Sequence, residues 1–284
     1  MNIGCCLRGR AVSLHTMPTA VQPKEKTTMP ELVTQKGLVL HETAYSEADK
    51  IIDILTEDGI RTVRVRGARK PQSKYAAVTQ LFAYGEFCLR ETKGKYYLDS
   101  AVSLNLFYPL RSDLNALALG AYFADLVKLT ATDQHQPQIL RLFLICLHYL
   151  SEKLRPIPQI KAAFELRLLA DSGMMPNLIC CPVCMQYMPA HPILRIAKAD
   201  LVCAECYGMP GLNDIAVSQA ALLAVRHVAY SELDKVLCFR VRGTALKQFI
   251  TYSEKYILHR LEFRVPSLDF YYDVVGEQSE AFES

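Results

Sequence analysis

Two pairs of cysteines constrain the fold of this chain more than any other feature. Cys181 and Cys184 form one Cys-x-x-Cys pair, Cys203 and Cys206 form a second, and 18 residues separate the pairs. Four thiolates at this spacing can close a tetrahedral shell around one zinc ion, with each pair holding the metal from a tight turn. We therefore predict one structural zinc bound by these four residues, since four cysteine ligands leave no open position for a reacting water.

Other chemistries for the cysteines fit less well. Disulfides require an oxidising compartment and no export signal is visible, and a thioredoxin-type centre uses a single pair beside a βαβ pattern that is missing here. A nucleobase deaminase needs His-x-Glu upstream and a proline before its cysteine pair, whereas Pro182 follows Cys181 and no glutamate stands two places after His148. A zinc hydrolase is disfavoured by the closed shell, while Cys180 and His191 remain alternative ligands.

Length and charge set broad limits. A chain of 284 residues is long enough for two domains, and a net charge of only +3 means that any affinity for nucleic acid has to come from local clustering. The most apolar stretch, residues 139–150, is broken by Arg141 and His148 and is far shorter than the roughly 18 residues of a membrane span. We expect a soluble protein with no membrane association.

The two ends of the chain lack periodic patterns. Residues 1–28 carry basic residues without the apolar run of a signal peptide, and we expect them to be a disordered leader. Residues 263–284 are predicted to be a C-terminal tail that frays from Gly276 onward.

Residues 29–108 are predicted to be an OB-fold, a small β-barrel. An Asp-Gly turn at Asp58 and Gly59 between two apolar runs is a strong hairpin signal. In the second run Val63 and Val65 alternate with arginines, so one face is expected to be buried and the other exposed. Five short strands suit such a barrel, and they are predicted at 37–41, 50–56, 60–66, 80–90 and 95–104.

Residues 109–262 are predicted to form a helical domain. Apolar residues recur there at helical spacing in five segments. The segments are 113–129, 138–154, 159–171, 218–231 and 244–261. The four-cysteine module, at about 178–212, is inserted between the third and fourth of them, which gives an α+β protein.

A basic cluster is the best candidate for a binding surface. Six cations fall within 14 residues that contain no Asp or Glu, and they are Arg61, Arg64, Arg66, Arg69, Lys70 and Lys74. Such a surface attracts phosphates independently of base sequence, and the nearby aromatics Tyr75, Phe82, Tyr84 and Phe87 either stack on unpaired bases or fill the barrel core. The competing interpretation is an ordinary solvated strand face.

Other candidate chemistry is sparse. Gly67 and Gly94 are isolated, so neither type of glycine-rich phosphate loop is present. Glu42, Glu47 and Asp49 cluster before the hairpin and are interpreted as solvated strand and turn residues in preference to a carboxylate metal site.

Three segments resemble the RecO family of bacterial DNA repair proteins. The segment KGLVLHETAYSEADKIIDILTEDGIRTVRVRGARKPQSKY is similar to the family's apolar strand, Y-x-E-x-D-K turn, hairpin and KGARRPKS-like basic loop. The segment AFELRLLADSGMMPNLICCPVC and the later CAEC are similar to the helix and cysteine pairs that follow. The resemblance covers about residues 34–262 and departs from the family between the cysteine pairs, where residues 185–202 replace glycine- and serine-rich sequence.

The resemblance implies a recombination mediator without a catalytic residue. Such a protein binds single- and double-stranded DNA, anneals complementary strands and, with RecR, helps RecA to load onto DNA coated by single-strand-binding protein (SSB), in the bacterial cytoplasm at the nucleoid. It also implies an apolar groove in the helical domain, with a cation at its rim, that binds the acidic tail of SSB. Candidate cations are Arg141, Lys153, Arg155 and Arg167. The alternative is a zinc-stabilised interaction or regulatory module that does not bind DNA directly.

Overall fold

The computed structural model describes the backbone of residues 31–132 and 134–283 and the side chains of residues 32–132 and 134–276. The predicted leader, residues 1–28, lies outside the described residues.

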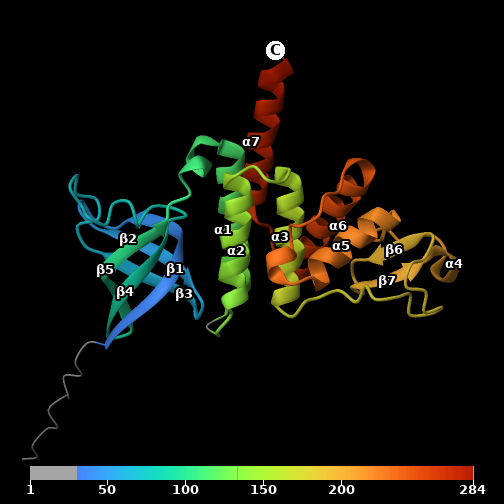
Figure 1. The fold of residues 1–284 in the computed structure, drawn as a ribbon, viewed down its shortest axis with the longest axis horizontal. Coiled ribbons are helices and arrows are strands. Elements are labelled where there is room, and N and C mark those ends of the chain that lie inside the picture. The colour runs from blue at the N-terminus through green and yellow to red at the C-terminus, as the bar shows by residue number, and fades with distance from the viewer. Residues whose placement is uncertain (1–30, 133, 284) are drawn as a thin grey trace, which may run out of the picture. The chain divides into compact units, whose positions relative to one another are not determined.

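The first part of the chain is a closed five-stranded barrel (Figure 1). Its strands are β1 (Glu31–Ala44), β2 (Lys50–Thr56), β3 (Gly59–Val65), β4 (Tyr84–Thr92) and β5 (Lys95–Asn105). They follow the order β1-β2-β3-β5-β4, and β1 pairs antiparallel with both β2 and β4. The only parallel pairing among the described strands, between β3 and β5, completes the barrel. The predicted OB-like architecture is confirmed.

The predicted hairpin sets the register of β2 and β3. Thr56 pairs with Gly59 across a two-residue loop, and Gly59 has a φ of 95°, which glycine adopts without steric cost. Val63 and Val65 face the barrel interior and are fully buried. Thr62 faces the other side of the strand and is exposed. Each buried valine contributes about 1.5–3 kcal/mol of hydrophobic stabilisation relative to an exposed one.

One predicted strand begins later than expected. Residues 67–83 form a series of turns, and β4 starts at Tyr84 in place of Gln80. Phe82 has a φ of 60°, and its backbone N–H donates to the carbonyl of Val39, so the chain bends onto β1 before the strand begins. The apolar character of residues 81–83 reflects burial in this turn.

All five predicted helices are present. They are α1 (Leu114–Thr130), α2 (Pro137–Ser151), α3 (Ile157–Asp171), α5 (Gln219–Tyr230) and α6 (Gly243–Leu261), with 3₁₀ turns at Tyr108–Ser112 and Leu233–Lys235. Asp113 and Ser218 cap α1 and α5 by accepting hydrogen bonds from the backbone N–H groups of Ala116 and Ala221. Such caps satisfy N–H groups that have no partner within the helix.

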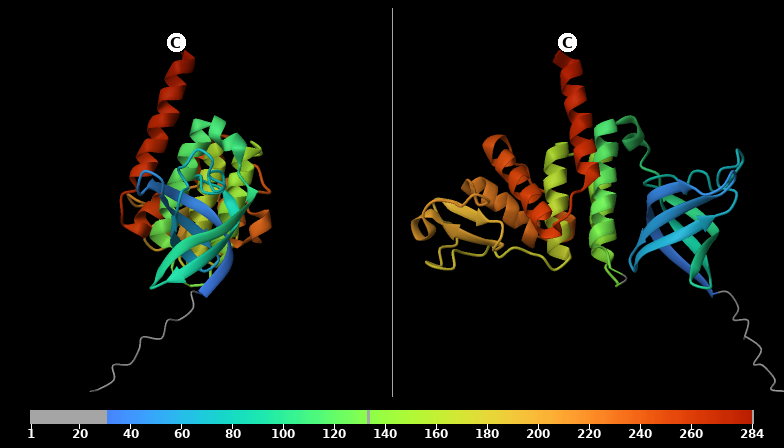
Figure 2. Two further views of the ribbon diagram at one scale, coloured as in Figure 1. Left: turned by 90° about the vertical axis from the view of Figure 1, so that its left-hand side faces the viewer. Right: turned by 180° about the vertical axis from the view of Figure 1, so that it is seen from behind.

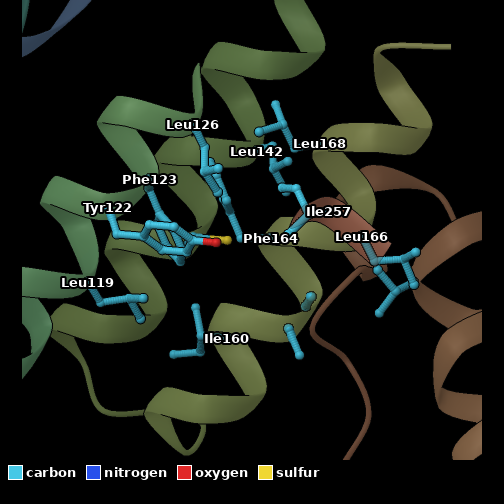
Figure 3. Close-up of a cluster of buried hydrophobic side chains, with 14 of the residues drawn as sticks. Leu119, Tyr122, Phe123, Leu126, Leu142, Ile160, Phe164, Leu166, Leu168 and Ile257 are labelled. Carbon is cyan, nitrogen blue, oxygen red and sulfur yellow. The ribbon is translucent and has the colours of Figure 1, made fainter. Parts of the chain in front are cut away.

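Aromatic side chains fill the core of the helical domain. The rings of Phe123 on α1 and Phe164 on α3 stack with centroids 3.8 Å apart, and Tyr122 lies beside them (Figure 3). Phe82, from the turn before β4, joins this core against Phe143, and a Cβ on Gly120 would come within 2.8 Å of the Phe82 ring. Close packing here requires glycine at position 120.

The cysteine segment carries a small sheet that the sequence pattern did not predict. It comprises β6 (Pro192–Arg195), β7 (Asp200–Cys203) and β8 (Ile215–Ala216) in the order β7-β6-β8, with the short helix α4 (Ala204–Tyr207) after β7 (Figure 1). The segment lies between α3 and α5, as predicted.

The C-terminal region differs from the expected tail. Residues Pro266–Glu283 form the helix α7, which packs against α1 (Figure 2). Leu268, Tyr271 and Val274 are buried at this contact, and only this short run of spaced apolar residues marks the helix in the sequence. Among the described residues, none of the helices combines the length and apolar character that crossing a bilayer requires.

Candidate nucleic-acid interface and metal site

We use the name basic surface for the six cations Arg61, Arg64, Arg66, Arg69, Lys70 and Lys74. Arg64 occupies an outward position of β3, and Arg66 follows at the end of the strand. Residues 67–74 continue as a loop in which the three cations are exposed and Ala68 is buried. Arg61 differs, because it shares the parity of the buried Val63 and is half-buried at the end of the barrel. By strand parity, Arg64 and Arg66 share the outward face of this segment, and Arg61 does not. Arg69, Lys70 and Lys74 follow in the adjoining loop.

Tyrosine rings lie under most of these cations. Neighbouring strands and turns supply the rings, and β5 supplies two of them because it pairs with β3 through Val63–Tyr96 and Arg64–Tyr97. The pairs are Arg61 with Tyr96 (5.7 Å to the ring centroid), Arg64 with Tyr45 (4.4 Å), Arg66 with Tyr97 (5.4 Å) and Lys74 with Tyr75 (4.9 Å). A ring face attracts a cation and restricts where it points.

The two alternatives for the nearby aromatics, base stacking and core packing, apply to different residues. Phe82 and Phe87 are 2% and 1% exposed and belong to the hydrophobic cores, so they present no face to a ligand. Tyr75 does lie at the basic surface, and its hydroxyl donates to the carbonyl of Asp99 at 2.6 Å. Sequence analysis missed Tyr45, Tyr96 and Tyr97. Tyr96 and Tyr97 become recognisable only once the register of β5 against β3 is known, and Tyr45 lies in the turn before β2, where no strand pattern marks it.

Two of the cations are held by the protein itself. Arg64 forms an ion pair with Asp49 at 2.7 Å, and Arg69 donates to the carbonyl of Ser46 at 2.5 Å. Within the part of the chain that the structure describes, Arg66, Lys70 and Lys74 form no ion pair. These three cations are the ones best able to neutralise phosphates, which release counterions when a protein binds them.

The four paired cysteines converge. The sulfurs of Cys181, Cys184, Cys203 and Cys206 all lie within 4.8 Å of one another, and those of Cys184 and Cys203 are 3.6 Å apart. Tetrahedral zinc with Zn–S bonds near 2.3 Å requires sulfurs about 3.8 Å apart, so a small contraction completes the shell. The donor set fits a metal ion.

Local hydrogen bonds shape the first cysteine turn. The N–H of Met185 donates to the carbonyl of Cys181 at 2.9 Å, and the N–H of Cys181 donates to the carbonyl of Gln186 at 3.0 Å. Burial opposes ionisation of Cys181, but N–H groups of this turn donate to its sulfur and lower its pKa to about 6. Burial and a hydrogen bond with Cys206 raise the pKa of Cys203. A divalent cation bound by the four sulfurs would remove the mutual repulsion of their thiolates.

The two alternative ligands lie outside this cluster. His191 is exposed, and its Nδ1 lies 3.0 Å from Oε1 of Glu205. Cys180 is half-buried and does not join the four sulfurs that come together.

A buried arginine attaches the cysteine module to the helical domain. Arg226 on α5 is only 5% exposed and donates to the carbonyls of Leu178, Ile179 and Tyr187 at 2.7, 2.9 and 2.6 Å. Its guanidinium also lies 4.1 Å from the centre of the Tyr187 ring. Burial lowers the pKa of Arg226, and the carbonyl oxygens compensate its charge.

Two adjoining hollows form a cationic groove in the helical domain. A cavity of about 760 Å³ has an apolar wall that includes Leu223, Phe239 and Val241, and a second of about 350 Å³ shares Val241 with it. Among the described residues, no acidic side chain lines either hollow. The cations that line them are Lys153, Arg155, Arg226, Arg240 and Arg242. We call this surface the cationic groove.

Fold and sites together define a class of protein, an OB-like barrel with a basic surface followed by a helical domain that carries a four-cysteine module. The family models described as Recombination protein O N terminal and Recombination protein O C terminal match residues 29–107 and 111–269. The chain belongs to the RecO family of DNA repair proteins, which confirms the resemblance seen in the sequence.

Three similar proteins share the name DNA repair protein RecO. DNA repair protein RecO of Acetivibrio thermocellus is 31% identical over 239 residues, which cover 82% of this chain and 94% of the relative. DNA repair protein RecO of Myxococcus xanthus is 31% identical over 240 residues, and that of Symbiobacterium thermophilum is 29% identical over 239 residues, each with 82% and 94% coverage.

Proposed function

We propose that this protein binds single- and double-stranded DNA through the basic surface, anneals complementary strands and, with RecR, assists the loading of RecA onto SSB-coated DNA at the bacterial nucleoid. The observation that carries the proposal is a set of cations on one side of the barrel, several of them laid on tyrosine rings, in a segment without acidic residues. Phosphate is the ligand that such a surface favours.

Annealing needs positioning more than covalent chemistry. Two complementary strands repel each other through their phosphates, and a basic surface lowers that repulsion when it holds one strand while the other pairs with it. Tyrosines that already carry a guanidinium on one face restrict the cations, so less ordering is needed when a strand binds. No residue that forms or breaks bonds is required.

The four cysteines fit zinc, and we propose that zinc is the resident ion. Bound zinc supplies a tetrahedral cross-link between two turns that are distant in sequence. The residues of this chain then hold the module in place, since Arg226 ties the segment around Cys181 to α5. The role is structural, because four sulfurs fill the coordination shell.

The cationic groove is the site that we propose for the acidic tail of SSB. Its apolar wall suits an apolar side chain, and Arg240 and Arg242 at the shared rim suit carboxylates. Of the cations suggested by the sequence, Lys153 and Arg155 line this groove. Arg141 and Arg167 do not line the groove and are paired with Asp234 and Asp171. Lys153 is itself paired with Asp113 at 3.5 Å.

Charge reversal tests the DNA proposal. The triple variant R66E, K70E and K74E changes three exposed cations and should abolish binding of labelled single-stranded DNA at low salt. The matched control is K198E, K247E and K255E, which changes the net charge equally at exposed lysines of the helical domain. Equal affinities in the two triple variants would contradict binding at the basic surface. A labelled SSB-tail peptide tests the groove, because R240E with R242E should remove its binding and leave DNA binding intact.

A further inference from the structure

An aspartate lies within the basic surface. Asp49 ends the turn of residues 45–49 between β1 and β2, and its side chain is 15% exposed, so it is not the solvated turn residue that the sequence suggested. Its Oδ2 accepts hydrogen bonds from Nη2 and Nε of Arg64 at 2.7 and 3.2 Å. Its Oδ1 accepts a hydrogen bond from the N–H of Gly67 at 2.9 Å, at the start of the basic loop. The Gly67 N–H and the Arg64 guanidinium hold the pKa of Asp49 below its usual range.

The same turn holds the basic loop at further points. The carbonyl of Ala48 accepts a hydrogen bond from the N–H of Arg69 at 2.9 Å, and the carbonyl of Ser46 accepts one from the Arg69 guanidinium. Ser46 in turn accepts a hydrogen bond from the N–H of Asp49 through its Oγ at 3.1 Å. The turn therefore contacts the loop through three hydrogen bonds, from Gly67 to Asp49, from the Arg69 N–H to Ala48 and from the Arg69 guanidinium to Ser46. Two further hydrogen bonds join Asp49 to Arg64 in β3.

We infer that Asp49 is a positioning residue for the basic surface, which holds Arg64 and the start of the 67–74 loop so that Arg66, Lys70 and Lys74 are arranged for phosphates before DNA arrives. The inference rests on the proposed DNA binding. In this arrangement Arg64 binds Asp49 in place of a phosphate, because its Nη2 lies 2.7 Å from Oδ2 of Asp49 and the carboxylate neutralises its charge.

Two effects of removing Asp49 have opposite signs. A carboxylate repels phosphate, so its loss alone should strengthen DNA binding, by roughly twofold for one charge about 10 Å away in water. Release of the loop has the opposite effect, since each long side chain that must then be ordered on binding weakens affinity by about 2- to 10-fold. With at least two cations in the released loop, the second effect is the larger.

The experiment compares D49A with E47A in the full chain. Glu47 is exposed in the same turn, so E47A removes an equal charge without touching the hydrogen bonds of Asp49. We expect E47A to bind labelled single-stranded DNA as tightly as the wild type or more tightly, and D49A to bind more weakly by about 2- to 10-fold or more. D49N keeps an oxygen that can accept from the Gly67 N–H, so its affinity for DNA should lie between those of D49A and the wild type.

Trypsin provides a readout without DNA. Cleavage after Arg69 and Lys74 should be faster in D49A than in E47A, whereas the bond after Lys70 is protected by Pro71 in all variants. Circular dichroism checks folding, and if D49A unfolds, the comparison of D49N with E47A decides the question. If the wild type binds DNA and the Asp49 variants bind as tightly as E47A, the inference alone is overturned. If the wild type does not bind single-stranded DNA, the proposed function fails and the inference fails with it.

Discussion

Replacing Arg226 by methionine should loosen the cysteine module and destabilise the whole domain. Methionine approximates the aliphatic part of arginine, so R226M removes the guanidinium without opening a large cavity. Three carbonyls, of Leu178, Ile179 and Tyr187, lose donors that lie 2.6–2.9 Å away.

The magnitude follows from those three bonds. A hydrogen bond to a charged group contributes about 1.5–3 kcal/mol, but Ile179 and Tyr187 are exposed, so water replaces part of the loss. Leu178 is fully buried, so water does not replace the hydrogen bond that its carbonyl loses. We expect a loss of about 3 kcal/mol in the free energy of unfolding, which lowers the Tm by about 6–12 °C in a chain of this size.

Thermal unfolding and metal release form the assay. R226M should unfold at the lower temperature and release zinc to a chelator faster than the wild type. The control is R260M, because Arg260 also reaches carbonyls of the module, at Ile196 and Ala197, but at 3.5 Å, where little hydrogen-bond energy remains. If R226M is as stable as R260M, the argument that Arg226 attaches the module is wrong.

Three further perturbations have defined outcomes. C203S should lose the metal and lower the Tm, while C238S, a cysteine outside the cluster, should do neither, as measured by metal analysis and calorimetry. K161M should cost about 3–5 kcal/mol because it leaves the Glu165 carboxylate buried without the ammonium 2.6 Å away, and adding E165Q should recover part of that loss in urea unfolding. The lowered pKa of Asp49 means that its contribution to stability is present above about pH 4 and is lost as the pH falls through its folded-state pKa. Cleavage of the 67–74 loop by an acid-active protease of broad specificity should therefore accelerate below about pH 4.

Local patterns predicted much of the fold. The Asp58–Gly59 turn and the alternation at Val63 and Val65 fix a hairpin through interactions between near neighbours. The five helices have apolar residues at helical spacing and, in two cases, a capping side chain next to the first turn. The four cysteines were recognisable because metal ligands need specific atoms at short spacings.

Features that depend on distant contacts were not predictable in the same way. Phe82 and Tyr97 are both aromatic, yet Phe82 packs into the helical core while Tyr97 lies under Arg66. The first outcome depends on the turn that bends onto β1 and the second on the register of β5 against β3. Asp49 was interpreted as solvated because its partners, Arg64 and Gly67, are 15 and 18 residues away. α7 was missed because its buried face is short and its stability depends on contact with α1.

The salt dependence of single-stranded DNA binding tests the central claim most directly. Labelled oligo-dT titrated with the wild-type protein across a range of salt concentrations gives the slope of log affinity against log salt. Three to four cations that each neutralise one phosphate predict a slope of about −2 to −3, because each contact contributes about −0.7 on a single strand. R66E with K70E and K74E should flatten that slope. Wild-type binding that is absent, or that does not change with salt, would contradict the assignment of the basic surface to DNA.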